Sequence, residues 1–258
     1  MTLLHHLNAV PLWVVTLAFA MVLMLSMAIG RWLRRFVSVD PATVGSGQLV
    51  VGAVSLLSLL VGFTFSLALN RHDERRNLLL EEANAIRALH RSLVHVEEPG
   101  RTEIGDALEG YARGRLAFVQ SNLFDQEAQQ GVRSVERERL NQVVAEVVPR
   151  SHTGVNQAQI LVAATRILDA GTRMEMAMLS HVPARVVLVI YMLSTGSALL
   201  IGLSLGGHLR QLWLAAAIWS VLLSIALFTI VDLDAPHWGS IRLDTGPLEV
   251  AVRTTAGG

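Results

Sequence analysis

The chain alternates between long apolar runs and charged, amphipathic segments, a pattern that predicts an all-α membrane protein with four transmembrane helices. The apolar runs cover residues 12–30, 49–70, 186–206 and 212–231. Each is long enough, as a helix, to cross a hydrocarbon layer of about 30 Å. Trp13 and Trp32 flank the first run, as aromatic residues do at the two surfaces of a bilayer. This run is too long for the hydrophobic part of a typical signal peptide and no Arg precedes it, so we expect it to be retained.

The second apolar run ends abruptly in six consecutive polar residues, Arg71 to Arg76, five of which carry a full charge. No Pro or Gly marks the end of a helix at this boundary. We therefore expect one continuous helix that crosses the membrane and runs past Arg76 into water. This helix organises the rest of the chain.

Small residues recur along the second run at steps of three or four, which places them on one helix face. They are Gly52, Ser55, Ser58, Gly62 and Ser66. Small residues let membrane helices approach closely, and the pattern by itself favours such packing. The other interpretation is a face that lines a pore, with Leu59 and Phe63 as a narrow apolar ring.

We expect residues 71–182 to form a helical bundle inserted between the second and third spans and continuous with both of them. Apolar residues at steps of three and four predict that the long helix continues to about Val96. Three further soluble helices are expected over about residues 102–122, 130–148 and 155–180. We therefore divide the chain into residues 1–70 (spans one and two), 71–182 (soluble helical domain), 183–231 (spans three and four) and 232–258 (polar tail).

The tail contains Pro236, Gly239, Gly246 and Pro247, residues that commonly interrupt helices. We expect it to form an ordered strap or loop. Asp232 and Asp234 stand at its start, directly after the fourth span, where a helix dipole disfavours carboxylates. Two crossings separate the ends of spans two and four, so both ends lie on the same side of the membrane.

This shared side makes the arginines after the second span available to compensate the two carboxylates. We expect Arg71, Arg75 or Arg76 to pair with Asp232 or Asp234. The alternative is that the carboxylates form a charged ring that attracts ions at a channel mouth.

The distribution of arginines beside the spans indicates on which side of the membrane the helical domain lies. The side of the helical domain carries Arg71, Arg75, Arg76, Arg173, Arg185 and Arg242, and the other side carries Arg31, Arg34, Arg35 and Arg210. The positive-inside rule then favours a cytoplasmic helical domain and tail.

Composition narrows the possible functions. The 258 residues are 52% hydrophobic, contain no Cys and have a formal net charge of zero, which gives no general attraction to nucleic acid. The absence of Cys excludes thiolate metal sites. All 21 basic residues are Arg, so lysine nucleophiles are excluded as well. None of the nine His residues belongs to the paired His motif of a helical zinc site. We expect no enzyme activity, metal or cofactor, and we expect Glu81 and Glu82 to form part of a solvated face that pairs with nearby Arg.

The order of two spans, a helical insert, two spans and a tail resembles the plan of the bestrophins. Ser58 to Phe63, with Arg71 further on, looks like the bestrophin neck pattern of Ser, three apolar residues, Gly and Phe. The stretches GFTFSLALNRHDERRNLLLEEANAIRA and DLDAPHWGSIRL are similar to signatures of the bacterial bestrophin-like domain membrane family. This second resemblance covers about residues 10–250.

The resemblance implies a pentameric channel in the bacterial inner membrane, with anions as the conducted ions. By position, it would put the neck at Ser55, Leu59 and Phe63, although bestrophins have an apolar residue in place of Ser55. The acidic cluster that binds calcium in animal bestrophins is absent, so the resemblance does not imply calcium gating.

The resulting hypothesis is a homo-oligomeric ion channel whose pore is lined by the second span. The candidate pore-lining residues are Ser55, Ser58, Leu59, Gly62, Phe63 and Ser66. The alternative is a non-conducting membrane scaffold or sensor whose helical domain binds a partner. The surroundings of Ser55, Ser58 and Phe63 discriminate between the two, because packing against other spans of the same chain would favour the scaffold.

Overall fold

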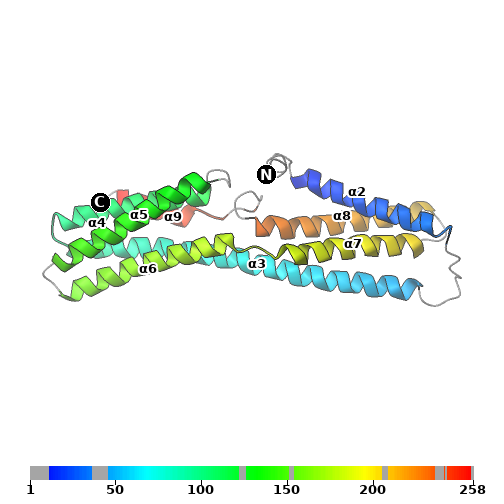
Figure 1. Ribbon diagram of the computed structural model, residues 1–258, viewed down its shortest axis with the longest axis horizontal. Helices are drawn as coiled ribbons and strands as arrows, with labels where there is room; N and C mark the ends of the chain where they lie inside the picture. The colour runs from blue at the N-terminus through cyan, green and yellow to red at the C-terminus, as the bar shows by residue number, and fades with distance from the viewer. Residues whose placement is uncertain are drawn as a thin grey trace. The chain divides into compact units, whose positions relative to one another are not determined.

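The computed structural model describes residues 12–36, 46–121, 126–150, 154–204, 209–235, 241 and 243–256. Every regular element in these residues is a helix, and none is a strand (Figure 1). The α-helices are α2 (Leu12–Leu33), α3 (Ser46–Ser92), α4 (Gly100–Gln120), α5 (Gln126–Val147), α6 (Gly154–Leu179), α7 (Ala184–Ser204), α8 (Leu209–Asp234) and α9 (Gly246–Ala256). Short 3₁₀ helices cover Leu93–His95 and Val148–Arg150. Pro236, Gly239 and Arg242 lie outside the described residues, as does the side chain of Arg210.

The chain forms two compact units. One contains Met1–Asn70 and His181–Asp234, and the other contains Arg71–Ser180 and Ala235–Gly258. Among the described residues, four helices are long and apolar enough to cross a membrane, and they correspond to α2, the first part of α3, α7 and α8. We call the first unit the membrane unit and the second the helical unit.

Helix α3 contributes to both units. Its 47 residues run without interruption from Ser46 to Ser92, through the boundary between Phe65 and Arg76. The expectation of one continuous helix is confirmed at this point. Helix α6 is not continuous with α7, because residues 180–183 separate them, and Pro183 directly precedes α7.

Glycine allows the closest approach inside the membrane unit, where α2 packs against α7 and α8. A Cβ atom at Gly30 of α2 would overlap the carbonyl oxygen of Leu199, and one at Gly202 of α7 would overlap that of Met27. Leu23, Met27, Ala198 and Ala216 form the core beside these contacts. This is the packing of small residues that brings membrane helices together.

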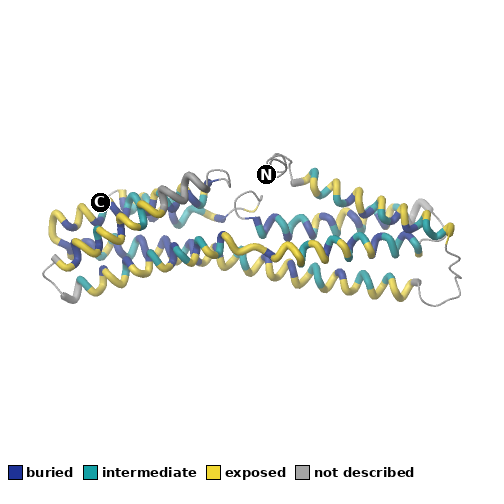
Figure 2. The backbone as a smooth tube through the Cα atoms, viewed as in Figure 1, coloured by how far each residue is buried: buried dark blue, intermediate teal, exposed yellow. Residues whose placement is uncertain are grey.

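The helical unit has its own apolar core, and α4 packs against both α5 and α9 (Figure 1). Ile86, Leu89, Ile104 and Leu108 are fully buried in this core. They recur at steps of three and four along α3 and α4, which is the spacing that predicts amphipathic helices. Figure 2 shows the resulting mixture of buried and exposed positions along each helix.

The expectation of a strap or loop at the C-terminus is wrong for residues 246–256, which form helix α9. Gly246 and Pro247 occupy its first turn, where Pro is tolerated because the first N–H groups have no partner inside the helix. Asp244 accepts a hydrogen bond from the N–H of Gly246 (3.0 Å), and the Thr245 hydroxyl bonds Glu249 (2.9 Å). Leu248 is fully buried in the core of the helical unit.

Candidate functional site

The six candidate pore-lining residues lie on the exposed part of α3 in the membrane unit. Leu59 is 56% exposed and Phe63 is 66% exposed. Ser55, Ser58, Gly62 and Ser66 are exposed as well. The buried face of the same segment carries Leu57, Thr64 and Ala68. Successive residues turn by about 100° around a helix, so this buried face lies opposite Ser55, Leu59 and Ser66.

Ser58 and Gly62 lie toward one edge of the exposed face, where a groove of about 370 Å³ separates α3 from α8. Phe65 lines the same groove from α3, and Trp219 and Thr229 line it from α8. The Ser58 hydroxyl donates to the carbonyl oxygen of Val54 (2.8 Å). Ser55, Leu59, Phe63 and Ser66 do not line the groove. We call Gly52, Ser55, Leu59, Gly62, Phe63 and Ser66 the α3 stripe.

The glycines of the α3 stripe do not pack against other helices of the same chain. A Cβ atom at Gly52 or Gly62 would meet nothing within 4 Å. Gly30 and Gly202, in contrast, touch backbone atoms of a neighbouring helix. Close packing of α3 within its own chain, which the pattern by itself favours, therefore does not account for the small residues.

The other spans expose a different kind of surface. The most exposed apolar residues of α2 include Trp13, Met21 and Leu25, and those of α7 and α8 include Met192, Leu214 and Leu222. Large apolar side chains are suited to contact with lipid tails, whereas exposed Ser and Gly add little apolar area. The α3 stripe thus gathers several exposed small residues on one face, whereas α7 exposes a single glycine, Gly196, to open space.

Arg71 and Arg75 cap the C-terminal end of α6 in the helical unit. The Arg75 side chain donates to the carbonyl oxygens of Ala177 (Nε, 3.1 Å) and Ser180 (Nη2, 2.6 Å), and the residue is only 1% exposed. Arg71 donates to the Ser180 hydroxyl (2.7 Å). Carbonyl groups in the last turn of a helix lack partners and form a negative dipole end, so the two cations stabilise this end. Arg76 is exposed.

The carboxylates after the fourth span belong to the membrane unit. Asp232 is 2% exposed, and Asp234 accepts bonds from the N–H of Val182 at 3.0 Å (Oδ1) and 2.9 Å (Oδ2). These bonds from an N–H group just before α7 stabilise the Asp234 carboxylate at the end of α8, where the helix dipole disfavours it. Pairing with Arg71, Arg75 or Arg76 stays a prediction. Unchanged thermal stability of an Asp232→Asn variant would count against it.

Glu82 is the centre of a buried polar network in the helical unit, so the expectation of a solvated position is wrong for this residue. Its carboxylate accepts two bonds from Arg115, from Nε (2.5 Å) and Nη2 (2.9 Å), and one from the Tyr111 hydroxyl (2.7 Å). Arg115 also donates to Glu175 (3.1 Å) and lies over the ring of Phe118 (5.3 Å). Glu82 is 0% exposed and Arg115 is 2% exposed.

Burial and the Glu82 charge change the proton affinities of the two partners. Burial alone would lower the pKa of Arg115, but attraction to Glu82 outweighs it and the pKa is raised. Burial, followed by the Glu82 charge, raises the pKa of Tyr111 well above 10.0. Tyr111 is therefore a neutral phenol at physiological pH, and it lies beside the buried ion pair of Arg115 and Glu82. Gly171 leaves space for it, since a Cβ atom there would overlap the Tyr111 hydroxyl.

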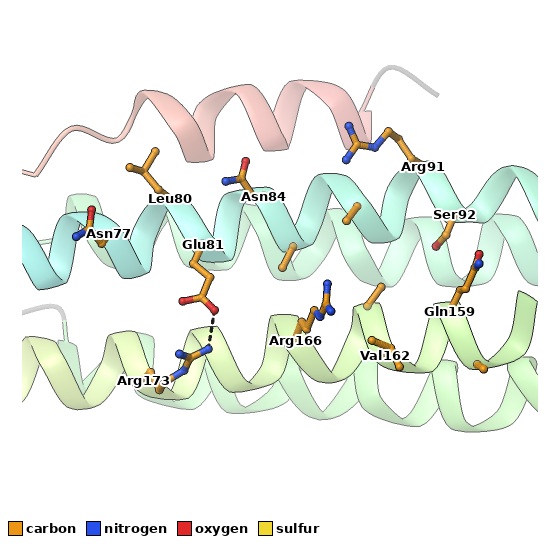
Figure 3. Close-up of a pocket in the computed structure, with 14 residues that line it drawn as sticks. Asn77, Leu80, Glu81, Asn84, Arg91, Ser92, Gln159, Val162, Arg166 and Arg173 are labelled. Carbon is orange, nitrogen blue, oxygen red and sulfur yellow. Dashed lines mark hydrogen bonds and ion pairs between the residues drawn. The ribbon is translucent and has the colours of Figure 1, made fainter.

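A second groove, of about 1160 Å³, lies between α3 and α6 within the helical unit (Figure 3). Asn77, Glu81 and Asn84 line it from α3, and Arg166 and Arg173 line it from α6. Glu81 pairs with Arg173 at 2.7 Å, and both side chains are about half exposed. The expectation of a solvated position with a nearby Arg partner is thus confirmed for Glu81. Within the described part of the chain, no group of three or more His, Asp or Glu residues is placed to hold a metal ion.

These observations define an integral membrane protein with four spans and a helical unit, which is formed by the segment between spans two and three together with the C-terminal helix α9. The family model of the bestrophin-like domain matches residues 16–248, and the chain belongs to this family. The resemblance seen in the sequence is therefore confirmed. The comparison with curated proteins gives no match.

Solved structures of bacterial bestrophin homologues have a similar fold. A variant of the homologue from Klebsiella pneumoniae aligns with a TM-score of 0.72 at 12% identity, covering 93% of this chain and 97% of that chain. A structure of the same homologue solved by Zn-SAD phasing gives a TM-score of 0.67 at 12% identity, with coverage of 94% and 96%. At these identities the comparison establishes the fold alone.

Proposed function

We propose that the protein is a homo-oligomeric ion channel whose pore is lined by the α3 stripe. The observation that carries the proposal is that this stripe of small residues is exposed on the single chain. Phe63 and Leu59 are more than half exposed, and the glycines between and beside them have no close neighbour. A surface of this kind is suited to close approach of further copies around a central axis.

The packing of α3 supports the same assignment. Within its most apolar window, 11% of the residues of α3 are buried, against 22–28% for the other three spans. The second span is thus the one that its own chain covers least. Bestrophin-like membership adds the expectation of a ring of copies, a pentamer if the bestrophin plan applies.

In such a ring, Leu59 and Phe63 form the narrowest part of the pore. They are four residues apart and stack on one helix face. Each copy contributes one Phe63, so the ring is apolar and has no fixed charge. A constriction of this kind gates conduction by excluding water. Ser55 and Ser66 offer hydroxyl groups to water on either side of it.

The proposal is tested by recording from planar bilayers that contain purified protein. Phe63→Ala widens the constriction, so we expect it to raise the unitary conductance. Phe65→Ala is the matched control. It removes the same aromatic ring from the same helix, but Phe65 lines the groove toward α8 and is not part of the α3 stripe. Silent bilayers for the wild type and for Phe63→Ala, at protein densities verified in the membrane, would contradict the channel assignment.

A non-conducting scaffold or sensor is the second candidate. The groove between α3 and α6 favours it, since it offers a large polar surface to a partner (Figure 3). Arg166 and Asn84, two exposed residues of this groove, would then be binding residues. Substitution of both by Ala leaves conduction at wild-type level in a pure channel, but abolishes partner capture in a scaffold.

We further propose that the protein lies in the bacterial inner membrane, with the helical unit in the cytoplasm, on the basis of the arginine distribution. Lipids and ions are then its partners, and neither nucleic acid nor a cofactor is required. Because the chain has no Cys, a single Cys at the exposed position Arg113 reports sidedness. A maleimide that cannot cross membranes should label this Cys only after the cells are opened, and labelling of intact spheroplasts would refute the orientation.

A further inference from the structure

The end of α2 carries three arginines and two exposed aromatic side chains within six residues. They are Arg31, Trp32, Arg34, Arg35 and Phe36, which we call the α2-end cluster. The N–H groups of residues 34, 35 and 36 bond the carbonyl oxygens of residues 30, 32 and 33, at 2.9–3.1 Å. The backbone therefore caps three carbonyl groups of this helix end, and the arginines are not required for that purpose.

This end of the membrane unit has a positive charge that the nearby chain does not balance. The end of α2, the start of α3, the end of α7 and the start of α8 all lie there (Figure 1). Residues 31–46 and 205–210, which connect these helices, contain four arginines and a single acidic residue, Asp40, so their formal net charge is +3. None of the residues that the structure describes at this end is Asp or Glu.

Other charges of the chain are too distant to compensate this one. The next charged residues along the spans are Arg71 on α3, Arg185 before α7 and Asp232 on α8. Each is separated from this end by roughly 20 residues of helix, or about 30 Å. That distance exceeds a Debye length of about 8 Å at physiological ionic strength, so an anionic partner has to come from outside the chain.

Trp32 and Phe36 indicate the depth of the α2-end cluster in the membrane. Trp32 is 55% exposed and Phe36 is 71% exposed, and their rings meet edge to face with centroids 4.8 Å apart. Trp13, at the other end of α2, is exposed as well. Trp side chains prefer the headgroup level of a bilayer, and 19 residues of helix separate these two by about 28 Å. The arginines beside Trp32 thus lie at the level of the lipid phosphates.

We infer that the α2-end cluster binds the headgroup of an anionic phospholipid such as phosphatidylglycerol. A guanidinium group donates paired, charge-assisted hydrogen bonds to phosphate oxygens, and the two rings contact the glycerol and upper acyl region of the same lipid. Phosphatidylcholine offers the same phosphate, but its choline cation is repelled by the net charge of this end. The inference names the class of lipid and its site, and it requires only the four spans, so it does not depend on ion conduction.

Native mass spectrometry of the full-length protein in detergent measures the binding, with dioleoyl phosphatidylglycerol and dioleoyl phosphatidylcholine as probes. We expect tighter binding of phosphatidylglycerol. Arg34→Gln with Arg35→Gln should weaken it by about 25-fold, because each arginine at an anionic surface contributes roughly 1 kcal/mol, or about fivefold. Arg34→Lys with Arg35→Lys keeps both charges and should retain most of the preference. Arg35 is exposed, so Arg35→Gln alone, with an expected loss of about fivefold, replaces the double variant if that variant does not fold.

Arg113→Gln with Arg139→Gln is the matched control, because it removes two exposed arginines from α4 and α5 of the helical unit. We expect it to bind phosphatidylglycerol like the wild type. An equal loss in this control, or wild-type binding in the folded Arg34→Gln, Arg35→Gln variant, overturns the inference. Displacement of the lipid by an equal concentration of soluble glycerol 1-phosphate also overturns it, since the site would then take free phosphates. A loss confined to the variants of the α2-end cluster supports it, whether or not the protein conducts.

Discussion

Breaking the buried pair between Glu82 and Arg115 should destabilise the helical unit far more than breaking the exposed pair next to it. Arg115→Met keeps most of the apolar stem but removes the guanidinium, which leaves the buried Glu82 carboxylate with the Tyr111 hydroxyl. Removing one partner of a buried ion pair costs about 3–5 kcal/mol, because the other charge remains buried and uncompensated. The Arg115→Met variant also lacks the bond from Arg115 to Glu175 and the contact of the guanidinium with the Phe118 ring.

The neighbouring pair supplies a matched control. Glu81 directly precedes Glu82 on α3, yet its bridge to Arg173 joins side chains that are 51% and 53% exposed. Exposed pairs of this kind contribute about 0–1 kcal/mol. We therefore expect Glu81→Gln to leave the midpoint of thermal unfolding within a few degrees of the wild type. For a chain of this size, a loss of about 4 kcal/mol corresponds to a fall of roughly 10 °C in Arg115→Met.

Thermal unfolding in detergent, followed by far-UV circular dichroism, measures the difference. The double variant Glu82→Leu with Arg115→Met removes both charges, and we expect it to recover much of the stability lost in Arg115→Met. Equal midpoints for Arg115→Met and Glu81→Gln would refute the conclusion that burial makes the pair at Glu82 costly to break. A double variant less stable than Arg115→Met alone would refute the charge argument and indicate lost packing.

Two further predictions follow from the same structure. Gly202→Ala should lower the midpoint of thermal unfolding, because the added Cβ overlaps the Met27 carbonyl. Gly196→Ala on the same helix places its Cβ in open space and should have little effect. Equal midpoints for the two variants would contradict the contact between α2 and α7. Burial raises the pKa of Tyr111 in the folded state, so the phenol of the unfolded chain ionises first as the pH rises. The contribution of Tyr111 to the free energy of unfolding is therefore fully present below about pH 10 and is lost as the pH rises toward the raised pKa of the folded state. Alkaline titration of stability should show a steeper loss above about pH 10 in the wild type than in Tyr111→Phe, and parallel curves would refute this.

The sequence predicts the helices well because the strongest signals are local. The run without charge from residue 49 to 70, followed by charge without Pro or Gly, is sufficient to predict that α3 continues past Arg76. Helix α9 escapes the same reasoning, because Gly246 and Pro247 look like helix breakers although they occupy a first turn. Asp244 and Thr245 before them, with Glu249 after them, are the signal that could have identified its start.

The polar partners could not be predicted as well, since they depend on contacts between distant parts of the chain. Glu82 and Arg115 are 33 residues apart, and Asp234 finds the N–H of Val182 across 52 residues. One local signal at Glu82 does exist, because it stands four residues after Leu78 and four before Ile86, both of which are buried. A charged residue at a core position of an amphipathic helix indicates a buried partner.

The α3 stripe differs from these polar contacts, because the spacing of its residues is visible in the sequence but their function is not. Small residues at this spacing serve helix packing or a pore, and the pattern by itself favours packing. The structure adds that Gly52 and Gly62 have no neighbour within their own chain, while Gly30 and Gly202 have one. That difference is what favours a face used between copies.

Single-channel recording of the wild type beside Phe63→Ala tests the central claim most directly. The account predicts discrete currents for the wild type, a larger unitary conductance for Phe63→Ala, and a conductance near that of the wild type for Phe65→Ala. Silence from the wild type and from Phe63→Ala, with the protein present and folded in the bilayer, would contradict it.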